Sequence, residues 1–158
     1  MKISILAVGR LKSGAEQAQF NRYIDLFNAA ARNLKIAPMT VAEISEGRAD
    51  SADERKEAEA KSLLAKLGGA RLIALDEEGQ MVSSYEFTAM IARLRDEALD
   101  VGFAIGGPDG HGEAVKNAAH FQLSLSRLTL PHGLARIVLA EQAYRAVTIM
   151  QGHPYHRA

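Results

Sequence analysis

The sequence contains no cysteine, and this absence removes several kinds of chemistry. Without thiols the chain can form no disulfide framework, no thiolate zinc site and no cysteine nucleophile. The lack of cysteine is compatible with a reducing cytosol, and we expect a cytoplasmic protein. Long apolar runs are also missing, because none approaches the roughly 20 residues that a membrane-spanning helix needs. We therefore expect no membrane partner.

An excess of charge of either sign is missing too, since 19 Lys and Arg side chains balance 19 Asp and Glu side chains. Proteins that bind nucleic acid without specificity are usually basic overall, so the neutral balance argues against that class. The balance is uneven along the chain. Beyond residue 114 the only acid is Glu141, whereas the bases there are Lys116, Arg127, Arg136, Arg145 and Arg157. The C-terminal portion is a basic region on a neutral chain.

Internal repeats, low-complexity segments and long linkers are absent as well, so the sequence predicts one domain over residues 1–158. Apolar runs alternate with segments of helical periodicity, and most of the runs are apolar throughout. This pattern is typical of an α/β domain with a mainly parallel sheet flanked by helices. Strands are expected at residues 3–8, 34–44, 71–76, 101–105 and 121–125, and helices at about 13–33, 51–67, 84–94, 113–119 and 134–150, with a turn at 77–80.

In parallel sheets, ligands bind beyond the carboxyl ends of the strands. Three features of this sequence fall at such ends: Leu75-Asp76, the turn Gly106-Gly107-Pro108-Asp109-Gly110, and the segment from Leu125 to Pro131. The turn has neither the G-x-G-x-x-G spacing nor a Walker lysine. It is either a tight strand-to-helix turn or a backbone cradle for a nucleotide-like ligand. The segment from Leu125 is either a strand with its exit loop or a set of backbone groups that bind a heterocycle such as adenine.

The chain closes with His153-Pro154-Tyr155-His156-Arg157, an unusual concentration of reactive side chains. With His132, the two histidines invite a zinc site, but Pro154 keeps them off a common helical face and no carboxylate is near them in sequence. We therefore expect no metal. A general-base or RNA-contact role suits the histidines better, while Tyr155 can stack on a base and Arg157 can pair with phosphate.

Two helices carry charge. The run from Glu54 to Glu59 is most simply a solvated face of its helix. The last helix has a broad apolar surface, which suits either the core or a subunit interface. Its polar face comprises Arg136, Glu141, Arg145 and Thr148.

Over essentially its whole length the sequence resembles the RlmH family of ribosomal RNA large-subunit methyltransferases, in the SPOUT superfamily. The resemblance rests on Met1 to Gly9, on Ile105 to Gly110, on Leu125-Ser126 with Leu128 to His132, and on the closing residues from His153 to Arg157. It implies a sheet with a deep C-terminal trefoil knot and a homodimer. The implied activity is transfer of a methyl group from S-adenosylmethionine to N3 of a pseudouridine in helix 69 of 23S ribosomal RNA, within assembled ribosomes.

The resemblance also assigns roles to residues. Leu75, Gly106, Gly107, Leu125, Ser126, Arg127, Leu128, Thr129, Leu130 and Pro131 would bind the cofactor. His132, Arg136, Tyr155 and Arg157 would bind RNA, and His153, Tyr155, His156 and Arg157 would be catalytic. Either His156 or His153 could remove the N3 proton while Arg157 stabilises the developing oxyanion. A dimer would let the tail of one subunit complete the cofactor pocket of the other.

Three rival interpretations stay open from sequence. A non-catalytic ribosome-assembly factor could keep the same fold, a methyltransferase could act on another RNA nucleotide, and the three histidines could serve a metal-dependent hydrolase.

Overall fold

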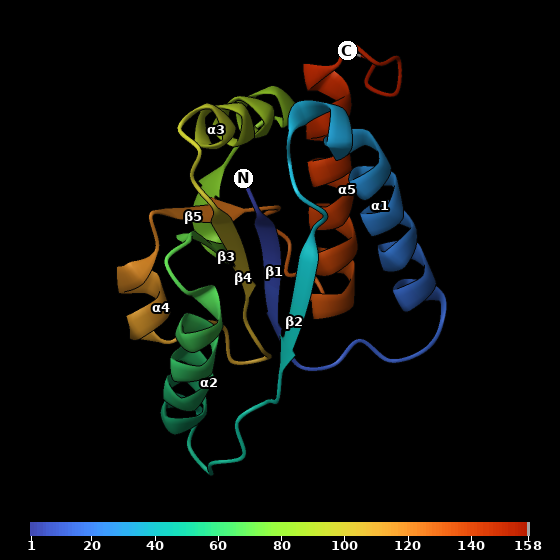
Figure 1. The fold of residues 1–158 in the computed structure, drawn as a ribbon. Coiled ribbons are helices and arrows are strands. Elements are labelled where there is room, and N and C mark those ends of the chain that lie inside the picture. The colour runs from blue at the N-terminus through green and yellow to red at the C-terminus, as the bar shows by residue number, and fades with distance from the viewer. Residues whose placement is uncertain (158) are drawn as a thin grey trace.

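The computed structural model describes residues 1–157, in which the strands form one parallel sheet (Figure 1). The strands are β1 (Ile3–Val8), β2 (Thr40–Ile44), β3 (Arg71–Met81), β4 (Val101–Ile105) and β5 (Phe121–Ser124). The helices are α1 (Ala15–Ala31), the 3-10 turn η1 (Arg32–Leu34), α2 (Ala52–Leu67), α3 (Ser84–Asp96), α4 (Glu113–Ala118) and α5 (His132–Met150). The strand order is β2-β1-β4-β3-β5, so the α/β class and the parallel sheet are confirmed.

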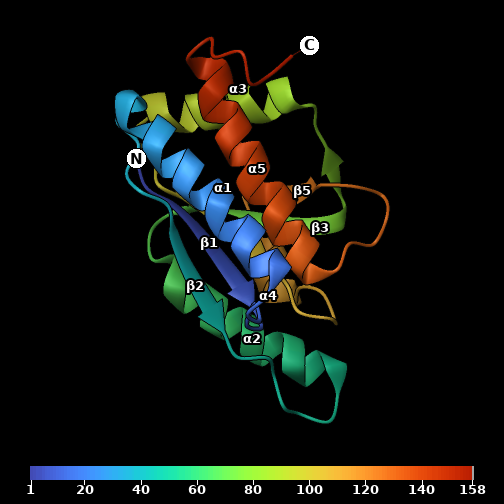
Figure 2. The same ribbon diagram turned by 90° about the vertical axis from the view of Figure 1, so that its right-hand side faces the viewer.

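Helices cover both faces of the sheet, and the alternation of side chains along each strand explains why (Figure 2). In β1, Ile3 and Ile5 enter a core shared with α1, α3 and α5. Leu6 and Val8 enter a second core, on the opposite face, that is completed by α2 and α4. Strands that are buried on both faces need apolar residues at nearly every position, which is what the sequence provides.

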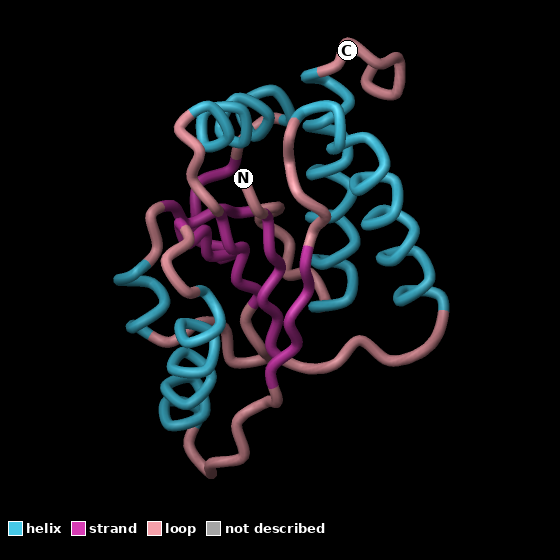
Figure 3. The backbone as a smooth tube through the Cα atoms, in the orientation of Figure 1, coloured by secondary structure: helices cyan, strands magenta, loops and turns pink. Residues whose placement is uncertain are grey.

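The loops that follow β1, β2 and β4 lie together at one edge of the sheet, because parallel strands all end on the same side (Figure 3). Helix α5 begins at this edge, runs back along the sheet beside α1, and also packs against α3 (Figure 2). The carboxyl edge therefore brings together segments that are far apart in the sequence.

Three expected boundaries are wrong. The second strand begins at Thr40 rather than Leu34, because the η1 turn and the left-handed Lys35 (φ 58°) occupy the preceding residues. The expected turn at 77–80 is a continuation of β3, which resumes its pairing with β5 after an irregularity between Leu75 and Gln80. Gly79 permits this, since a Cβ atom there would lie 2.6 Å from the carbonyl oxygen of Gln122. The last helix begins at His132, two residues before the expected start.

The deep trefoil knot remains a prediction. Within residues 1–157, no helix is both long enough and apolar enough to cross a membrane.

Candidate functional site

A cleft of about 720 Å³ lies at the carboxyl ends of β3, β4 and β5, beside the first turn of α5. Its floor is apolar and includes Leu75, Ile105 and Leu123. Residues predicted to bind the cofactor line it from three separate segments: Leu75, Gly106, Gly107, Leu125, Ser126, Leu128, Thr129, Leu130 and Pro131. His132, predicted to bind RNA, also lies on its wall. The three strand ends singled out in the sequence therefore meet at one cleft.

Glu77 holds the cleft wall from Leu125 to Pro131 in place by hydrogen bonds. The sequence predicts only a turn at this residue. Its main-chain carbonyl accepts hydrogen bonds from Arg127 Nη1 at 2.8 Å and from Ser124 Oγ at 3.1 Å. Its carboxylate accepts one from Thr129 Oγ1 at 3.0 Å. Arg127 thus supports the wall from outside the residues that line the cleft. No local signal could have shown this, because about 50 residues of chain separate the partners.

Gly106 and Gly107 of the turn after β4 lie close to other parts of the protein. A Cβ atom on Gly106 would lie 3.0 Å from the carbonyl carbon of Gly110. One on Gly107 would lie 3.0 Å from Cγ1 of Val8 and 3.3 Å from a carboxylate oxygen of Glu59. The turn is closed by a hydrogen bond from the Gly110 amide to the Gly107 carbonyl at 3.0 Å. The cleft wall is therefore pressed against β1 and α2.

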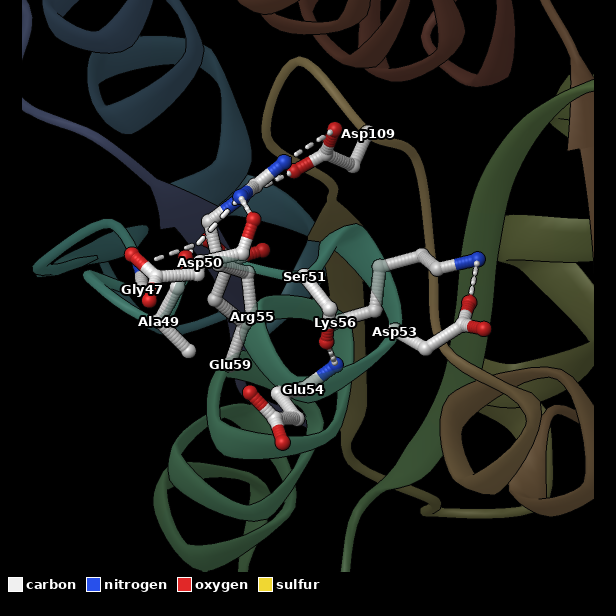
Figure 4. A network of polar contacts seen from close by, with 10 residues as sticks. All are labelled: Gly47, Ala49, Asp50, Ser51, Asp53, Glu54, Arg55, Lys56, Glu59 and Asp109. Carbon is white, nitrogen blue, oxygen red and sulfur yellow. Dashed lines mark hydrogen bonds and ion pairs between the residues drawn. The ribbon is translucent and has the colours of Figure 1, made fainter.

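Helix α2 clamps this turn through a bidentate ion pair (Figure 4). Arg55 Nε and Nη2 donate to the two carboxylate oxygens of Asp109, at 2.8 and 3.1 Å, and Nη1 donates to the carbonyls of Ala49 and Asp50. The hydrogen bond from Arg55 holds the pKa of Asp109 below its usual value. Nearby, Glu59 is buried and accepts a hydrogen bond from the Gly47 amide at 2.8 Å. The expectation of a simply solvated face is therefore wrong for Arg55 and Glu59.

Replacing Arg55 by methionine should weaken ligand binding at the cleft without abolishing catalysis. The turn would lose both hydrogen bonds that fix Asp109, so the pre-formed wall would have to be ordered on binding. We expect the KM for a substrate that binds in this cleft to rise about three- to tenfold while kcat changes less than twofold, the signature of lost uniform binding. Steady-state kinetics of Arg55→Met beside Arg93→Met, which breaks an exposed ion pair on α3, would measure it. An equal loss in kcat would contradict this role.

The rim of the cleft is acidic. Asp76, Glu77, Glu78 and Asp109 line it together with Lys116, and Asp109 is paired with Arg55 from outside the cleft. Lys116 Nζ lies 3.1 Å from Asp76 Oδ2. Burial acts to raise the pKa of Asp76, but a hydrogen bond from the Glu78 amide and the pairing with Lys116 outweigh it, so the pKa is lowered. An anionic rim of this kind favours a ligand that carries positive charge.

The closing residues form an ordered cluster on the last turns of α5. The Tyr155 hydroxyl donates to Glu141 Oε1 at 2.9 Å, and Arg145 binds the same carboxylate through Nε at 3.0 Å and through Nη2. The Arg145 guanidinium also lies over the Tyr155 ring, 4.8 Å from its centre. Burial, the hydrogen bond to Glu141 and one to Tyr23 raise the pKa of Tyr155 far above its usual value. Tyr155 is therefore a neutral hydroxyl at every physiological pH.

His156 is half-buried beside this cluster, whereas His153 and Arg157 are exposed. Arg145 Nη1 lies 3.2 Å from His156 Nδ1, and the ring of Tyr85 in α3 meets the His156 ring edge-on at 4.8 Å. His153 Nδ1 accepts a hydrogen bond from the Tyr155 amide at 3.1 Å. Among the described residues there is no group of three His, Asp or Glu side chains placed to hold a metal ion.

The cleft and the tail cluster lie at opposite ends of α5. His132 opens the helix at the cleft, and Tyr155 follows its last residue, Met150. A helix of 19 residues spans about 28 Å. The structure brings the predicted cofactor residues together and brings the predicted catalytic residues together, but within one chain it keeps the two groups apart.

The expectation that Arg136 and Thr148 belong to an exposed polar face is wrong. Both are buried, and Arg136 has no exposed surface with which to meet RNA. Its Nη2 donates to the carbonyls of Val8 and Gly9, at 3.1 and 2.7 Å, and its Nη1 donates to Glu43 Oε1 at 2.7 Å. Arg136 thus fastens α5 to the end of β1 and to Glu43 of β2.

Comparisons with known proteins agree with this geometry. A family model described as a predicted SPOUT methyltransferase matches residues 1–156. The ribosomal RNA large subunit methyltransferase H of Bartonella henselae is 48% identical over 99% of this chain and 99% of its own length. That of Methylocella silvestris is 49% identical with the same coverage. A probable methylase family protein from Haemophilus influenzae, 10% identical, superposes with a TM-score of 0.52 over 99% of this chain and 70% of that one, a likeness of fold.

Proposed function

Because the chain belongs to the SPOUT methyltransferase family, we propose that it transfers a methyl group from S-adenosylmethionine to N3 of a pseudouridine in helix 69 of 23S ribosomal RNA. The active form is a homodimer in the cytoplasm, and the substrate is the assembled ribosome. The observation that carries the proposal is the cleft at the ends of β3, β4 and β5, which gathers the predicted cofactor residues from three segments.

The cleft fits S-adenosylmethionine in size and chemistry. Its volume of about 720 Å³ falls in the range of small-molecule sites, which is about 300–1,000 Å³. The apolar floor around Leu75, Ile105 and Leu123 suits the adenine ring. The acidic rim suits a ligand that bears a sulfonium and an ammonium group. The wall from Leu125 to Pro131 offers main-chain donors and acceptors at fixed spacing for the adenine edge.

When bound, S-adenosylmethionine supplies a methyl group that is already activated by its sulfonium. The work left to the protein is to align the nucleophile, exclude water and stabilise charge. The cleft provides alignment and exclusion. Arg157 stabilises the oxyanion that develops on a ring carbonyl of the substrate base and pairs with RNA phosphate. Tyr155, whose hydroxyl is bonded to Glu141 and whose ring lies under the Arg145 guanidinium, offers a base only the ring surface that Arg145 leaves uncovered.

The distance between the cleft and the tail supports the proposed homodimer. One chain cannot fold its tail back along about 28 Å of helix without leaving the cluster of Glu141, Arg145 and Tyr155. A second copy related by a two-fold axis, with its α5 antiparallel to the first, would place its tail at this cleft. Exposed apolar side chains at the cleft end, Leu128 and Leu134, supply surface for such a contact.

Calorimetric titration with S-adenosylmethionine tests the proposed site. Gly107→Val should abolish saturable binding, because the added side chain would push the turn away from Val8 and Glu59 and distort the cleft wall. Gly69→Ala is the matched control, since a Cβ atom there meets nothing within 4 Å, and it should bind like the unaltered protein. Thermal unfolding of both variants reports whether each is folded. Absence of binding to the unaltered protein, with no methylation of ribosomes, would favour a non-catalytic assembly factor.

A further inference from the structure

Arg145 fixes which nitrogen of His156 carries the proton. Arg145 Nη1 lies 3.2 Å from His156 Nδ1, and a guanidinium has donors only. Nδ1 must therefore accept. A neutral imidazole whose Nδ1 accepts carries its hydrogen on Nε2. The Arg145 guanidinium is held in place by two further hydrogen bonds to Glu141, so the arrangement is rigid.

His153 is fixed in the same tautomer by a different donor. Its Nδ1 lies 3.1 Å from the main-chain nitrogen of Tyr155, and an amide N–H can only donate. Nε2 of His153 therefore also carries the hydrogen. In both histidines the lone pair of Nδ1 is already engaged by a donor of this chain, Arg145 for His156 and the Tyr155 amide for His153. Each histidine therefore presents Nε2–H, which can donate a hydrogen bond but cannot accept a proton.

From this geometry we infer that His153 and His156 act as hydrogen-bond donors to the substrate base and that neither removes its N3 proton. The inference rests on the proposed function, and it replaces the expectation of a histidine general base. His156 Nε2 has no hydrogen-bond partner among the described residues, so this N–H is not committed to another group. Because the atom is buried, the side chains around it must shift before the base reaches it.

Within residues 1–157, the groups that the structure places against His156 are compatible with this role. On its own tail there is Tyr155, a neutral hydroxyl bonded to Glu141. From α5 there are Arg145, whose pKa is raised by its hydrogen bond to Glu141, and the Glu141 carboxylate itself, which already accepts three hydrogen bonds besides one from Gln142. From α3 there is the Tyr85 ring, edge-on at 4.8 Å.

The methyl transfer balances without a protein base. N3 of the pseudouridine loses its proton to a solvent water or hydroxide. Its lone pair then forms the bond to the methyl carbon, while the carbon–sulfur bond breaks and its electron pair stays on sulfur. Negative charge spreads to the carbonyl oxygens that flank N3. A histidine N–H donated to one of those oxygens is stronger in the transition state than before it, which is the condition for acceleration.

Two variants of nearly equal shape separate a donor from a base. Gln in place of His156 keeps an N–H donor near the position of Nε2, whereas Glu offers only a carboxylate that can accept a proton. His156→Gln should keep kcat within about tenfold of the unaltered protein, and His156→Glu should lose about 100- to 1,000-fold, as when a donor to a developing oxyanion is removed. Thermal unfolding and calorimetric titration with S-adenosylmethionine, carried out on both variants, show whether each is folded and binds the methyl donor, so that the two kcat values are compared between folded proteins. The reverse ranking, or equal losses in two folded variants, would overturn the inference.

A second measurement reads the tautomer without catalysis. Nitrogen NMR of ¹⁵N-histidine-labelled protein distinguishes protonated from unprotonated ring nitrogens, and His156 should show hydrogen on Nε2 only. In Arg145→Met the donor to Nδ1 is gone and a mixture of tautomers should appear. Hydrogen on Nδ1 of His156 in the unaltered protein would overturn the inference. If the unaltered protein fails to methylate ribosomes, the proposed function fails, whereas the tautomer result stands by itself.

Discussion

Two inactive variants are expected to regain activity when they are produced together. One carries Gly107→Val and so has a damaged cleft but an intact tail; the other ends at Gln151 and so has an intact cleft but no tail. In a heterodimer, the intact cleft of the truncated chain meets the intact tail of its partner. Half of randomly formed dimers are heterodimers, and each has one complete site of two, so about a quarter of the unaltered activity should return.

The expected recovery depends on the fold of α5. The helix starts at the cleft and ends at the tail cluster, about 28 Å away for its 19 residues. If a chain used its own tail, each variant would lack one half of the site in every subunit and the mixture would stay inactive. Methylation of ribosomes by the co-expressed pair, measured beside each variant alone, distinguishes the two arrangements.

A chain that carries both changes is the matched control. Co-expressed with the unaltered chain, it forms heterodimers in which the intact cleft faces a missing tail and the intact tail faces a damaged cleft. These heterodimers should be inactive if the tail acts across the dimer, and half active if it acts within its own chain. The heterodimer can be purified by two different affinity tags, one on each chain. If it is half active, the tail acts within its own chain and not on the cleft of the partner.

The sheet and most of the cleft were predictable because their signals are local. A strand buried on both faces shows itself as an apolar run, and the parallel arrangement then places every strand end at one edge. For this reason Leu75, Gly106 and the segment from Leu125 to Pro131 could be assigned to one site from sequence, and the cleft contains them.

The supports of the cleft were not predictable, because each depends on contacts over a long stretch of chain. Arg55 and Asp109 are separated by 54 positions, and nothing near either residue marks the pair. Charges in a helix are ordinarily solvated, so the interpretation of Arg55 and Glu59 as a solvated face followed the common case. Only the packing of α2 against the turn after β4 decides otherwise.

The separation of the cleft and the tail was predictable only in part. The length of the last helix can be read from its apolar pattern, but the end of the sheet at which it starts cannot. The pattern also misplaced Arg136, since a lone arginine among apolar residues is expected to face solvent. Its burial becomes intelligible only when its hydrogen bonds to the carbonyls of Val8 and Gly9 are seen in the structure.

Replacing Arg136 by methionine should destabilise the protein more than the same replacement at the less buried arginines, such as Arg22, Arg55 or Arg93. The side chain is fully buried and supplies hydrogen bonds to Val8 O, Gly9 O and Glu43 Oε1. Methionine fills much of the same space but donates nothing, so two buried carbonyls would be left without this donor. Unsatisfied buried acceptors cost about 1–3 kcal/mol each, and we expect a total loss of about 3 kcal/mol.

Chemical and thermal unfolding would measure this loss. For a protein of this size about 3 kcal/mol corresponds to a fall in Tm of about 6–12 °C. Arg22→Met, at an exposed arginine of α1, makes the same chemical change on the surface and should alter stability by less than about 0.5 kcal/mol. Arg136→Lys should fall between the two, because one ammonium can reach only some of the three acceptors that the planar guanidinium serves. Equal stabilities of Arg136→Met and Arg22→Met would mean that the buried carbonyls find other donors, and that α5 is held at the end of β1 by its apolar contacts alone.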